Sequence, residues 1–252
     1  MTESLLREWG DHEVLTLTLN RPERRNAVDP DLLALLADAL ATDGARAHAV
    51  ILRGAGDDAF SAGYDLSRLT GTAADLDADA SIGSAAAAIR DCPAPVIARL
   101  RGHCYGAAVE LALTCDLRIA SPDLRMAVPA VSLGVVYRYE FVARLVEICG
   151  LARASDLLLG MQELDGERAH AWGFVSELIA PAELDGRVQA IAHRLARAPR
   201  AAARGTKASL NLLAARAVVP EDLHRAQALR AEAASSPERL EALRRRQKKL
   251  AD

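Results

Sequence analysis

The sequence predicts an α/β fold with largely parallel sheets, followed by a purely helical C-terminal region. Short apolar stretches of strand character alternate with stretches of helical periodicity over roughly the first 180 residues. Each strand stretch ends at Gly or a polar turn, which is typical of units in which a helix connects two parallel strands. From about residue 183 onward the chain carries only helical patterns, which Pro or Gly separate.

The first strand and helix lie near the N-terminus. Residues 14–20 (VLTLTLN) alternate apolar and polar side chains with period two, as a half-buried strand does. The turn RPERRNAV ends this strand, and residues 29–40 (DPDLLALLADAL) predict a helix. We expect Asp29 to be its N-cap and Pro30 to lie in the first turn, where the N–H that proline lacks has no intrahelical partner.

Two short buried strands follow, at residues 48–54 (HAVILRG) and 94–102 (APVIARLRG), each closed by a glycine. Between them, residues 75–88 (DLDADASIGSAAAA) are acidic and then rich in small side chains, which predicts a mobile loop. The second strand leads directly into a helix at residues 106–116 (GAAVELALTCD).

The remaining segments complete the two parts of the chain. Strands are predicted at residues 117–121, 125–128 and 173–180, and helices at 140–150, 152–160, 184–197, 199–217, 220–236 and 237–252. We therefore divide the chain into an α/β core, residues 1–195, and a C-terminal helical region, residues 196–252.

Composition excludes several classes of protein. A formal net charge of -3 argues against a protein that coats nucleic acid. The N-terminal stretch has no signal-peptide pattern, and no uncharged apolar stretch reaches the roughly 20 residues that span a bilayer. The four cysteines form no CxxC pair and no zinc-type cluster with histidine. We expect a cytoplasmic protein with no metal, no membrane and no nucleic-acid partner.

Two glycine-containing segments carry the signals for chemistry. Residues 60–66 (FSAGYDL) place a small-small pair after a strand, and residues 102–110 (GHCYGAAVE) begin a helix with Gly106 and two alanines. The N-terminal N–H groups of a helix lack intrahelical partners, so two such loops that converge can bind one oxygen as an oxyanion hole. From spacing alone, close helix packing is the simpler explanation of the same small residues.

Five segments in order, LNRPERRNAV, FSAGYDL, PVIARLRGHCYGAAVELALTCDLRIAS, LGVVY and WGFVSELI, together resemble the crotonase superfamily of enoyl-CoA hydratases and isomerases. The resemblance covers nearly the whole chain. It implies a ClpP/crotonase-like spiral of ββα units with a C-terminal helical trimerisation region, and therefore a homotrimer or hexamer. It also implies an acyl-CoA substrate and no cofactor beyond the coenzyme A of that thioester.

The resemblance also implies roles for residues at matching positions. The backbone N–H groups of Tyr64 and Ala107 are the expected oxyanion donors, although the family usually has Gly at the second place. Glu110 matches one of the two catalytic glutamates of hydratases. The second would fall near residue 130, which is Ala130, and Glu140 is a weak substitute. Hydration uses two carboxylates, so efficient hydration is not expected.

The stretch VSLGVVYRYE resembles the segment of methylmalonyl-CoA decarboxylases that carries an active-site tyrosine, which makes Tyr137 the matching residue. Arg138 beside it is a candidate to hold a substrate carboxylate. The match fails at Tyr64, where those decarboxylases have a histidine. A half-buried packing role for Tyr137 remains an alternative.

The resemblance further implies contacts to coenzyme A. The loop at Ala62, Asp65 and Leu66 matches the loop that receives the adenine, and Arg24 or Arg25 would meet CoA phosphates from the other side. In the C-terminal stretch RRRQKK, Lys249, together with Lys248, is a candidate for the lysine that reaches CoA, although a solvated helix face explains this stretch as well.

Three functions remain open from the sequence. The first is an enoyl-CoA hydratase/isomerase-family enzyme that works through a thioester enolate, with Glu110 as the proton carrier in an isomerase. The second is a malonyl- or methylmalonyl-CoA-type decarboxylase. The third is an acyl-CoA-binding protein without turnover.

Overall fold

The computed structural model describes residues 3–72, 74–215 and 218–251, and its core contains two sheets. The larger sheet has the order β1-β2-β3-β5-β7-β10. The first two strands pair antiparallel and all later pairs in this sheet are parallel. Its strands are β1 (Leu5–Trp9), β2 (Val14–Leu19), β3 (Ala49–Gly54), β5 (Val96–Leu100), β7 (Leu117–Ala120) and β10 (Glu177–Leu178).

The smaller sheet has the order β4-β6-β8-β9, with β4 (Ala59–Ser61), β6 (His103–Tyr105), β8 (Arg125–Ala127) and β9 (Leu164–Asp165). Along the chain, β3, β5 and β7 of the larger sheet are each followed by a strand of the smaller one. The backbone therefore steps repeatedly from one sheet to the other, with a helix before the next step. This confirms the predicted α/β spiral of ββα units.

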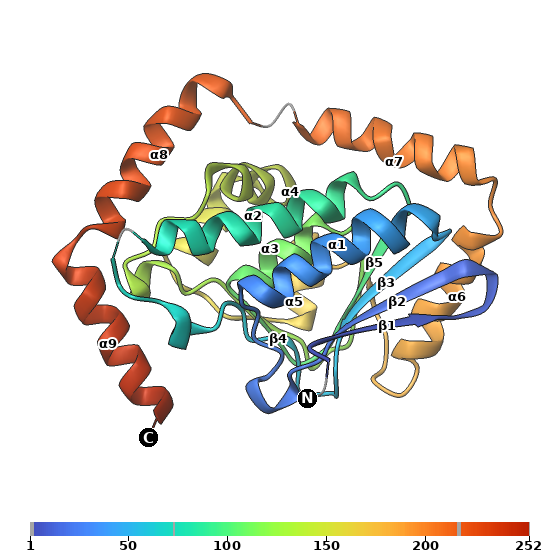
Figure 1. Cartoon of the computed structure of the whole chain (residues 1–252), viewed down its shortest axis with the longest axis horizontal. Helices are drawn as coiled ribbons and strands as arrows, with labels where there is room; N and C mark the ends of the chain where they lie inside the picture. Colours follow the sequence, from blue (N-terminus) through green and yellow to red (C-terminus); the bar gives the residue numbers. More distant parts are fainter. Residues whose placement is uncertain (1–2, 73, 216–217, 252) are drawn as a thin grey trace.

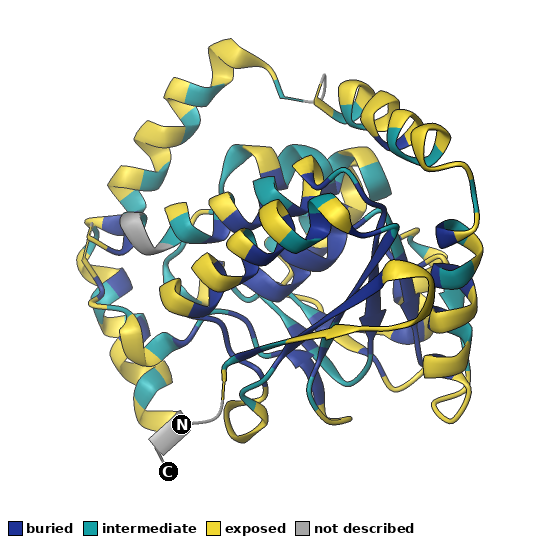
Figure 2. Ribbon diagram, turned by 45° about the vertical axis from the view of Figure 1, so that its right-hand side comes forward, coloured by how far each residue is buried: buried dark blue, intermediate teal, exposed yellow. Residues whose placement is uncertain are grey.

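Helices cover the sheet on both faces (Figures 1 and 2). The core on one face includes α1 (Pro30–Arg46), α2 (Asp75–Asp91) and α3 (Ala107–Thr114), whereas α6 (Leu184–Ala196) packs on the other. Strand β2 is consequently buried along its whole length, although its alternating sequence predicts a half-buried strand. The threonines of β2 are buried because α6 contacts this part of the sheet.

Helix α1 begins as the sequence predicts. The Asp29 side chain accepts a hydrogen bond from the N–H of Leu32 at 3.0 Å, and Pro30 is the first helical residue. The buried face includes Leu33, Leu36 and Leu40, at helical spacing. N-capping and burial of this stripe together account for the helix.

Residues 75–88, predicted to be a mobile loop, belong to helix α2. That prediction is wrong because the small residues hide a helical stripe: Ile82, Ala85, Ala86 and Ile89 are buried at spacings of three and four. Alanine also has the highest intrinsic helix propensity.

Two further predicted elements differ in extent. The helices predicted at 140–150 and 152–160 are one element, α4 (Tyr139–Leu158), interrupted at Gly150, whose φ is 80° and ψ 160°. The strand predicted at 173–180 is reduced to β10, because residues 173–176 form a turn after α5 and only Glu177 and Leu178 pair with β7. The short strands β1, β4, β6 and β9 and the short helix α5 (Gly166–Ala171) went unpredicted.

The C-terminal helices α7 (Arg200–Ala214), α8 (Pro220–Ala234) and α9 (Pro237–Ala251) arch around the body and return to it (Figure 1). Buried Lys207 holds α7 by donating to the carbonyls of Ile89 and Ala94 and pairing with Asp116 at 2.8 Å. Helix α8 contacts α2 and α4, and α9 contacts the 3-10 turns η3 (Leu66–Arg68) and η4 (Val131–Leu133). The division at residue 195 stays a prediction; α6, which ends beside it, packs on the sheet.

Candidate active site

The two glycine-containing loops meet in space. Gly63 has a φ of 89° and Gly106 a φ of 56°, a region that glycine adopts without strain. A Cβ atom on Gly63 would lie 2.4 Å from the carbonyl oxygen of Tyr105 and 3.5 Å from the backbone nitrogen of Ala107. Only glycine permits this close approach, which places the turn before Tyr64 against the start of α3.

Neighbouring hydrogen bonds fix both loops, and two backbone N–H groups remain without an acceptor among the described residues. Val28 donates to the carbonyl of Gly63 and accepts from the N–H of Asp65, both at 2.8 Å. The N–H of Gly106 donates to the carbonyl of Ala127 at 2.9 Å. Within residues 3–72, 74–215 and 218–251, no acceptor bonds the N–H of Tyr64 or of Ala107, the first residue of α3. Both residues line the same pocket.

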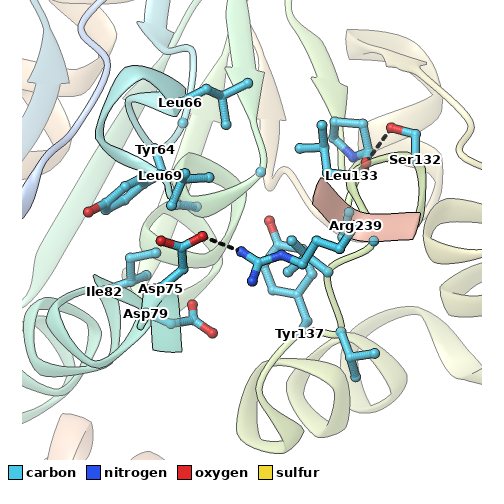
Figure 3. A pocket seen from close by; sticks show the side chains of 18 of the residues that line it. Tyr64, Leu66, Leu69, Asp75, Asp79, Ile82, Ser132, Leu133, Tyr137 and Arg239 are labelled. Carbon is cyan, nitrogen blue, oxygen red and sulfur yellow. Dashed lines mark hydrogen bonds and ion pairs between the residues drawn. The ribbon is translucent and has the colours of Figure 1, made fainter. Parts of the chain in front are cut away.

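The pocket has a volume of about 200 Å³ and lies between the two loops, α2, the segment 129–137 and the C-terminal helices (Figure 3). Its apolar wall is formed by Leu66, Leu69, Leu76, Ile82, Leu133, Val135 and Val136. Its polar groups come from Tyr64, Asp75, Asp79, Tyr105, Ser132, Tyr137, Arg230, Arg239 and Arg246. A concave site that combines an apolar wall with converging polar groups is typical of small-molecule binding.

Tyr137 projects its hydroxyl into this pocket (Figure 3). The Tyr137 oxygen lies 3.2 Å from where a Cβ on Gly106 would stand, so it is next to the start of α3. The hydroxyl has no hydrogen-bond partner in the described part of the chain, while the ring packs on Phe141 with centroids 4.9 Å apart. Burial, and secondarily the charge of Glu110, raises the pKa of Tyr137 well above its ordinary value. The hydroxyl therefore stays protonated and can act as a donor.

Glu110 is buried beneath the pocket and is not among its lining residues. Its Oε1 accepts a hydrogen bond from Nη2 of Arg138, whose guanidinium rests against Gly83 of α2. Burial raises the pKa of Glu110, and the nearby Arg138 only partly opposes this. Glu110 Oε2 and Arg138 Nε, both buried, lack hydrogen-bond partners among the described residues. Arg138, expected to meet a substrate carboxylate, instead meets the carboxylate of Glu110.

Position 130 holds a buried alanine in the pocket wall, and Glu140 is exposed in the first turn of α4, away from that wall. Neither position supplies a second carboxylate to the pocket. The carboxylates in the wall are those of Asp75 and Asp79, both from the segment predicted to be a loop.

Of the residues expected to bind coenzyme A, Ala62 and Leu66 line the pocket and Asp65 does not. Asp65 caps η3 and pairs with Arg24 at 2.9 Å and Arg21 at 3.2 Å. Burial alone would raise the pKa of Asp65, but hydrogen bonds from Ser67 and the arginines outweigh it and lower the pKa. Asp65 therefore holds the arginines in place.

The other residues expected to contact CoA, Arg24, Arg25, Lys248 and Lys249, are not among the residues that line this pocket. Arg24 is about half exposed, and the carbonyl of Arg25 accepts from the N–H of Ala62 at 2.8 Å. Lys249 lies on α9 beside a second cavity of about 620 Å³. Its lining residues are Ser132, Leu133, Ala242, Arg245, Arg246, Lys248 and Lys249.

Sequence reasoning missed four pocket residues that form two ion pairs. Asp75 pairs with Arg239 of α9 at 2.8 Å, and Asp79 pairs with Arg230 of α8. The spacing of four between the aspartates was a usable signal once 75–88 is recognised as a helix. The arginines are among many in the C-terminal helices, and nothing local distinguishes them.

Comparison with known proteins shows the family of the chain. The family model for enoyl-CoA hydratase/isomerase matches residues 10–249. The chain belongs to the enoyl-CoA hydratase/isomerase family. A peroxisomal Delta(3,5)-Delta(2,4)-dienoyl-CoA isomerase of Arabidopsis thaliana is 31% identical over 226 residues, covering 83% of this chain and 81% of the relative.

Solved structures with the same fold include two that cover nearly the whole chain. An enoyl-CoA hydratase/isomerase from Xanthobacter autotrophicus Py2 superposes with a TM-score of 0.84 at 31% identity, over 97% of this chain and 94% of that one. Methylmalonyl-CoA decarboxylase in complex with 2-nitronate-propionyl-CoA superposes with a TM-score of 0.91 at 22% identity, over 99% and 97%. At that identity the second likeness concerns the fold alone.

Two features are absent from the residues that the structure describes. No helix among them is long and apolar enough to cross a membrane. They also contain no group of three or more His, Cys, Asp or Glu side chains that could hold a metal ion.

Proposed function

We propose that this chain catalyses a reaction of an acyl-CoA thioester through an enolate intermediate. The observation that carries the proposal is the pair of unpartnered N–H groups, Tyr64 and Ala107, in one pocket. A thioester oxygen that accepts from both becomes a better hydrogen-bond acceptor as negative charge develops on it, so the donors stabilise the enolate more than the substrate.

The proton donor to the enolate carbon is Tyr137. Its hydroxyl is beside the start of α3, faces the pocket, and stays protonated because its pKa is raised. Glu110, the proton carrier expected for an isomerase, lies beneath the pocket and is held by Arg138. This arrangement favours reactions in which a protonated group acts on the enolate over reactions that begin with a carboxylate base.

Decarboxylation of a malonyl-type thioester is the specific reaction that this observation favours. The bond between C2 and the substrate carboxylate breaks, CO₂ leaves, and the electron pair becomes the enolate held by the two N–H groups. The Tyr137 hydroxyl then gives its proton to C2, and water returns a proton to the tyrosinate. The apolar wall near Ile82 and Val135 favours loss of the charged carboxylate as neutral CO₂.

Binding of the nucleotide part is proposed for both sides of the pocket. Arg24 and Arg25 at the loop of Ala62 would meet phosphates from one side. Lys248 and Lys249, with two arginines, provide four cations around the second cavity. We also propose a cytoplasmic homotrimer or hexamer that uses no cofactor apart from the coenzyme A of the substrate.

The test is incubation of the protein with crotonyl-, 3-enoyl-, malonyl- and methylmalonyl-CoA in heavy water, read by mass spectrometry. Loss of CO₂ with deuterium at C2 is the expected result. Migration of the double bond of the 3-enoyl thioester would favour the isomerase instead. Rapid hydration of crotonyl-CoA would contradict the roles given to Ala130 and Glu110. Binding without any conversion of the panel would support the non-catalytic acyl-CoA-binding protein.

A further inference from the structure

The loop that carries Tyr64 is held by a single residue from another part of the chain, Val28. The two residues form a parallel β-bridge, in which the N–H of Val28 donates to the carbonyl of Gly63 at 2.8 Å. The carbonyl of Val28 accepts from the N–H of Asp65, also at 2.8 Å. In such a bridge a residue bonds the two neighbours of the residue opposite, so the N–H of Tyr64 itself points away from Val28. The bridge therefore orients the N–H that the proposed function uses as an oxyanion donor.

Asn26, two residues before Val28, fastens this segment to the body of the protein through its side chain. The amide nitrogen donates to the carbonyl of Ala59 at 2.8 Å and to that of Ala55 at 2.9 Å. The amide oxygen accepts from the N–H of Arg21 at 3.1 Å. Asn26 is only 1% exposed, and both of its amide N–H groups are used. A buried amide with its donors satisfied in this way fixes the backbone to which it belongs.

The backbone at Asn26 has the conformation that brings the two segments together. Its φ is 55°, in the left-handed region that asparagine adopts more readily than most residues with a side chain. Arg25 before it has a φ of 50°, and its carbonyl accepts from the N–H of Ala62 at 2.8 Å. The chain thus turns so that the next residues run beside the Tyr64 loop. Gly54 leaves room for the amide, because a Cβ atom there would lie 2.6 Å from Nδ2 of Asn26.

Asn26 is not among the residues that line the pocket, so it acts on a ligand only through the backbone that it holds. Arg21 supports the same segment by donating to the carbonyl of Ala27 at 2.8 Å and pairing with Asp29 at 2.9 Å. An oxyanion hole stabilises charge because its donors are in place before that charge develops. Misplacement of such a group by about 1 Å can cost roughly 10²-fold in rate.

We infer that Asn26 is a positioning residue of the oxyanion hole. Its side-chain amide fixes the bridge at Val28 and thereby directs the N–H of Tyr64 to the thioester oxygen. This inference rests on the proposed acyl-CoA function. It adds to that function a residue outside the pocket that determines the rate of enolate formation.

Infrared spectroscopy of bound acetyl-CoA, labelled with ¹³C at the thioester carbonyl, tests the inference without turnover. Acetyl-CoA has no carboxylate to lose, and two hydrogen bonds to its carbonyl oxygen should lower the stretching frequency relative to free acetyl-CoA. Asn26→Gly keeps the left-handed backbone and removes the amide, whereas Asn26→Asp keeps the shape and removes both donors. Each variant should lose about half of the shift, because one of the two donors no longer points at the oxygen.

Kinetics and a control variant separate positioning from general stability. With a substrate that the protein converts, kcat of both Asn26 variants should fall about 10²-fold while KM changes little. Asn20→Ala is the matched control, because the Asn20 amide donates to the carbonyl of Glu3 at 2.8 Å and makes no bond to the bridge at Val28. This control should keep the carbonyl shift and kcat. Thermal unfolding of all three variants measures their loss of stability, and a purely structural role of Asn26 would lower stability without changing the spectrum.

Each outcome bears on a different claim. A full carbonyl shift in the Asn26 variants, or an equal loss of shift in Asn20→Ala, would overturn the inference and leave the proposed function intact. Absence of acetyl-CoA binding by the natural protein, or binding with an unshifted carbonyl, would overturn both. If neither Asn26 variant folds, Arg21→Lys is a milder change to the same segment, since one ammonium cannot replace the guanidinium fork. An unchanged shift in Arg21→Lys would then overturn the inference, and a reduced shift would support it.

Discussion

Arg138 donates a hydrogen bond to Glu110 beneath the pocket, and its neighbour in sequence, Tyr137, points its hydroxyl into the pocket. The side chains of these two adjacent residues thus point in opposite directions. Arg138 pairs with a buried carboxylate, and Tyr137 faces the pocket. The side chains of Glu110 and Arg138 are only 4% and 16% exposed. The carboxylate expected from the sequence to carry protons is therefore bound within the protein, and the tyrosine is the group in reach of a substrate.

Replacing Tyr137 with Phe should abolish most of the activity while substrate binding is kept. The ring and its contact with Phe141 remain, and only the donor beside Gly106 is lost. Because a positioned acid contributes roughly 10²–10⁴-fold to rate, kcat should fall by about that factor with little change in Kd. Tyr139→Phe is the matched control, since its hydroxyl bonds Asp222 outside the pocket. Equal activity of the two variants would exclude Tyr137 as the donor.

Replacing Arg138 with Met should destabilise the fold strongly. It leaves the carboxylate of Glu110 buried without its partner, and removal of one member of a buried pair costs about 3–5 kcal/mol. Adding Glu110→Gln to the same chain should recover most of the free energy of unfolding, as urea denaturation would measure. If the double variant is as unstable as Arg138→Met alone, the two side chains are not coupled.

The pKa of Glu110 gives a dependence of stability on pH. Burial raises this pKa above the ordinary 4.5, so between that pH and the raised value the folded state binds more protons than the unfolded chain. The free energy of unfolding should therefore fall, relative to Glu110→Gln, as pH rises through this window. Urea denaturation of both proteins at a series of pH values from 4.5 upward measures the difference. Parallel curves would mean that the pKa is not raised.

Gly63→Ala should destroy the site, whereas Gly56→Ala should not. Both glycines have positive φ, 89° and 71°, so both variants carry the same kind of backbone strain. A Cβ on Gly63 meets the carbonyl oxygen of Tyr105 at 2.4 Å, while one on Gly56 meets nothing within 4 Å. Measuring the activity and the thermal unfolding of both variants separates the effect of steric overlap at Gly63 from the effect of backbone strain. Full activity of Gly63→Ala would contradict the close approach of the two loops.

Replacing Lys248 and Lys249 with Ala should raise KM for substrates that carry the whole of coenzyme A. The same change should not affect the corresponding pantetheine thioester, because that compound lacks the nucleotide and its phosphates. The two lysines border the second cavity, and their effect should weaken with added salt. Arg225→Ala serves as the control, because it removes an exposed cation of α8 that borders neither cavity. An equal rise in KM for both thioesters would argue against a phosphate contact.

Local patterns sufficed to predict much of the fold. The cap at Asp29, the strand run at 49–54 and the strand followed by the helix bearing Glu110 all depend on neighbours in the chain, and the structure has them. Short strands such as β4 were missed because three residues carry no periodicity. Helix α2 was missed because its buried face consists mostly of small side chains, which give a weak apolar pattern in the sequence. The contacts of this face with α1 and α3 are visible only in the tertiary structure.

The α/β alternation and the glycines that permit positive φ follow from the sequence, because each depends on residues close together in the chain. The membership of the family also follows from it, because five segments carry the resemblance in order along nearly the whole chain. Only the tertiary structure decided that Gly63 lies against the start of α3, that Arg138 forms an ion pair with Glu110, and that Arg230 forms an ion pair with Asp79. These partners are separated by tens to more than a hundred residues, and folding selects them by burial and charge pairing that no local pattern encodes.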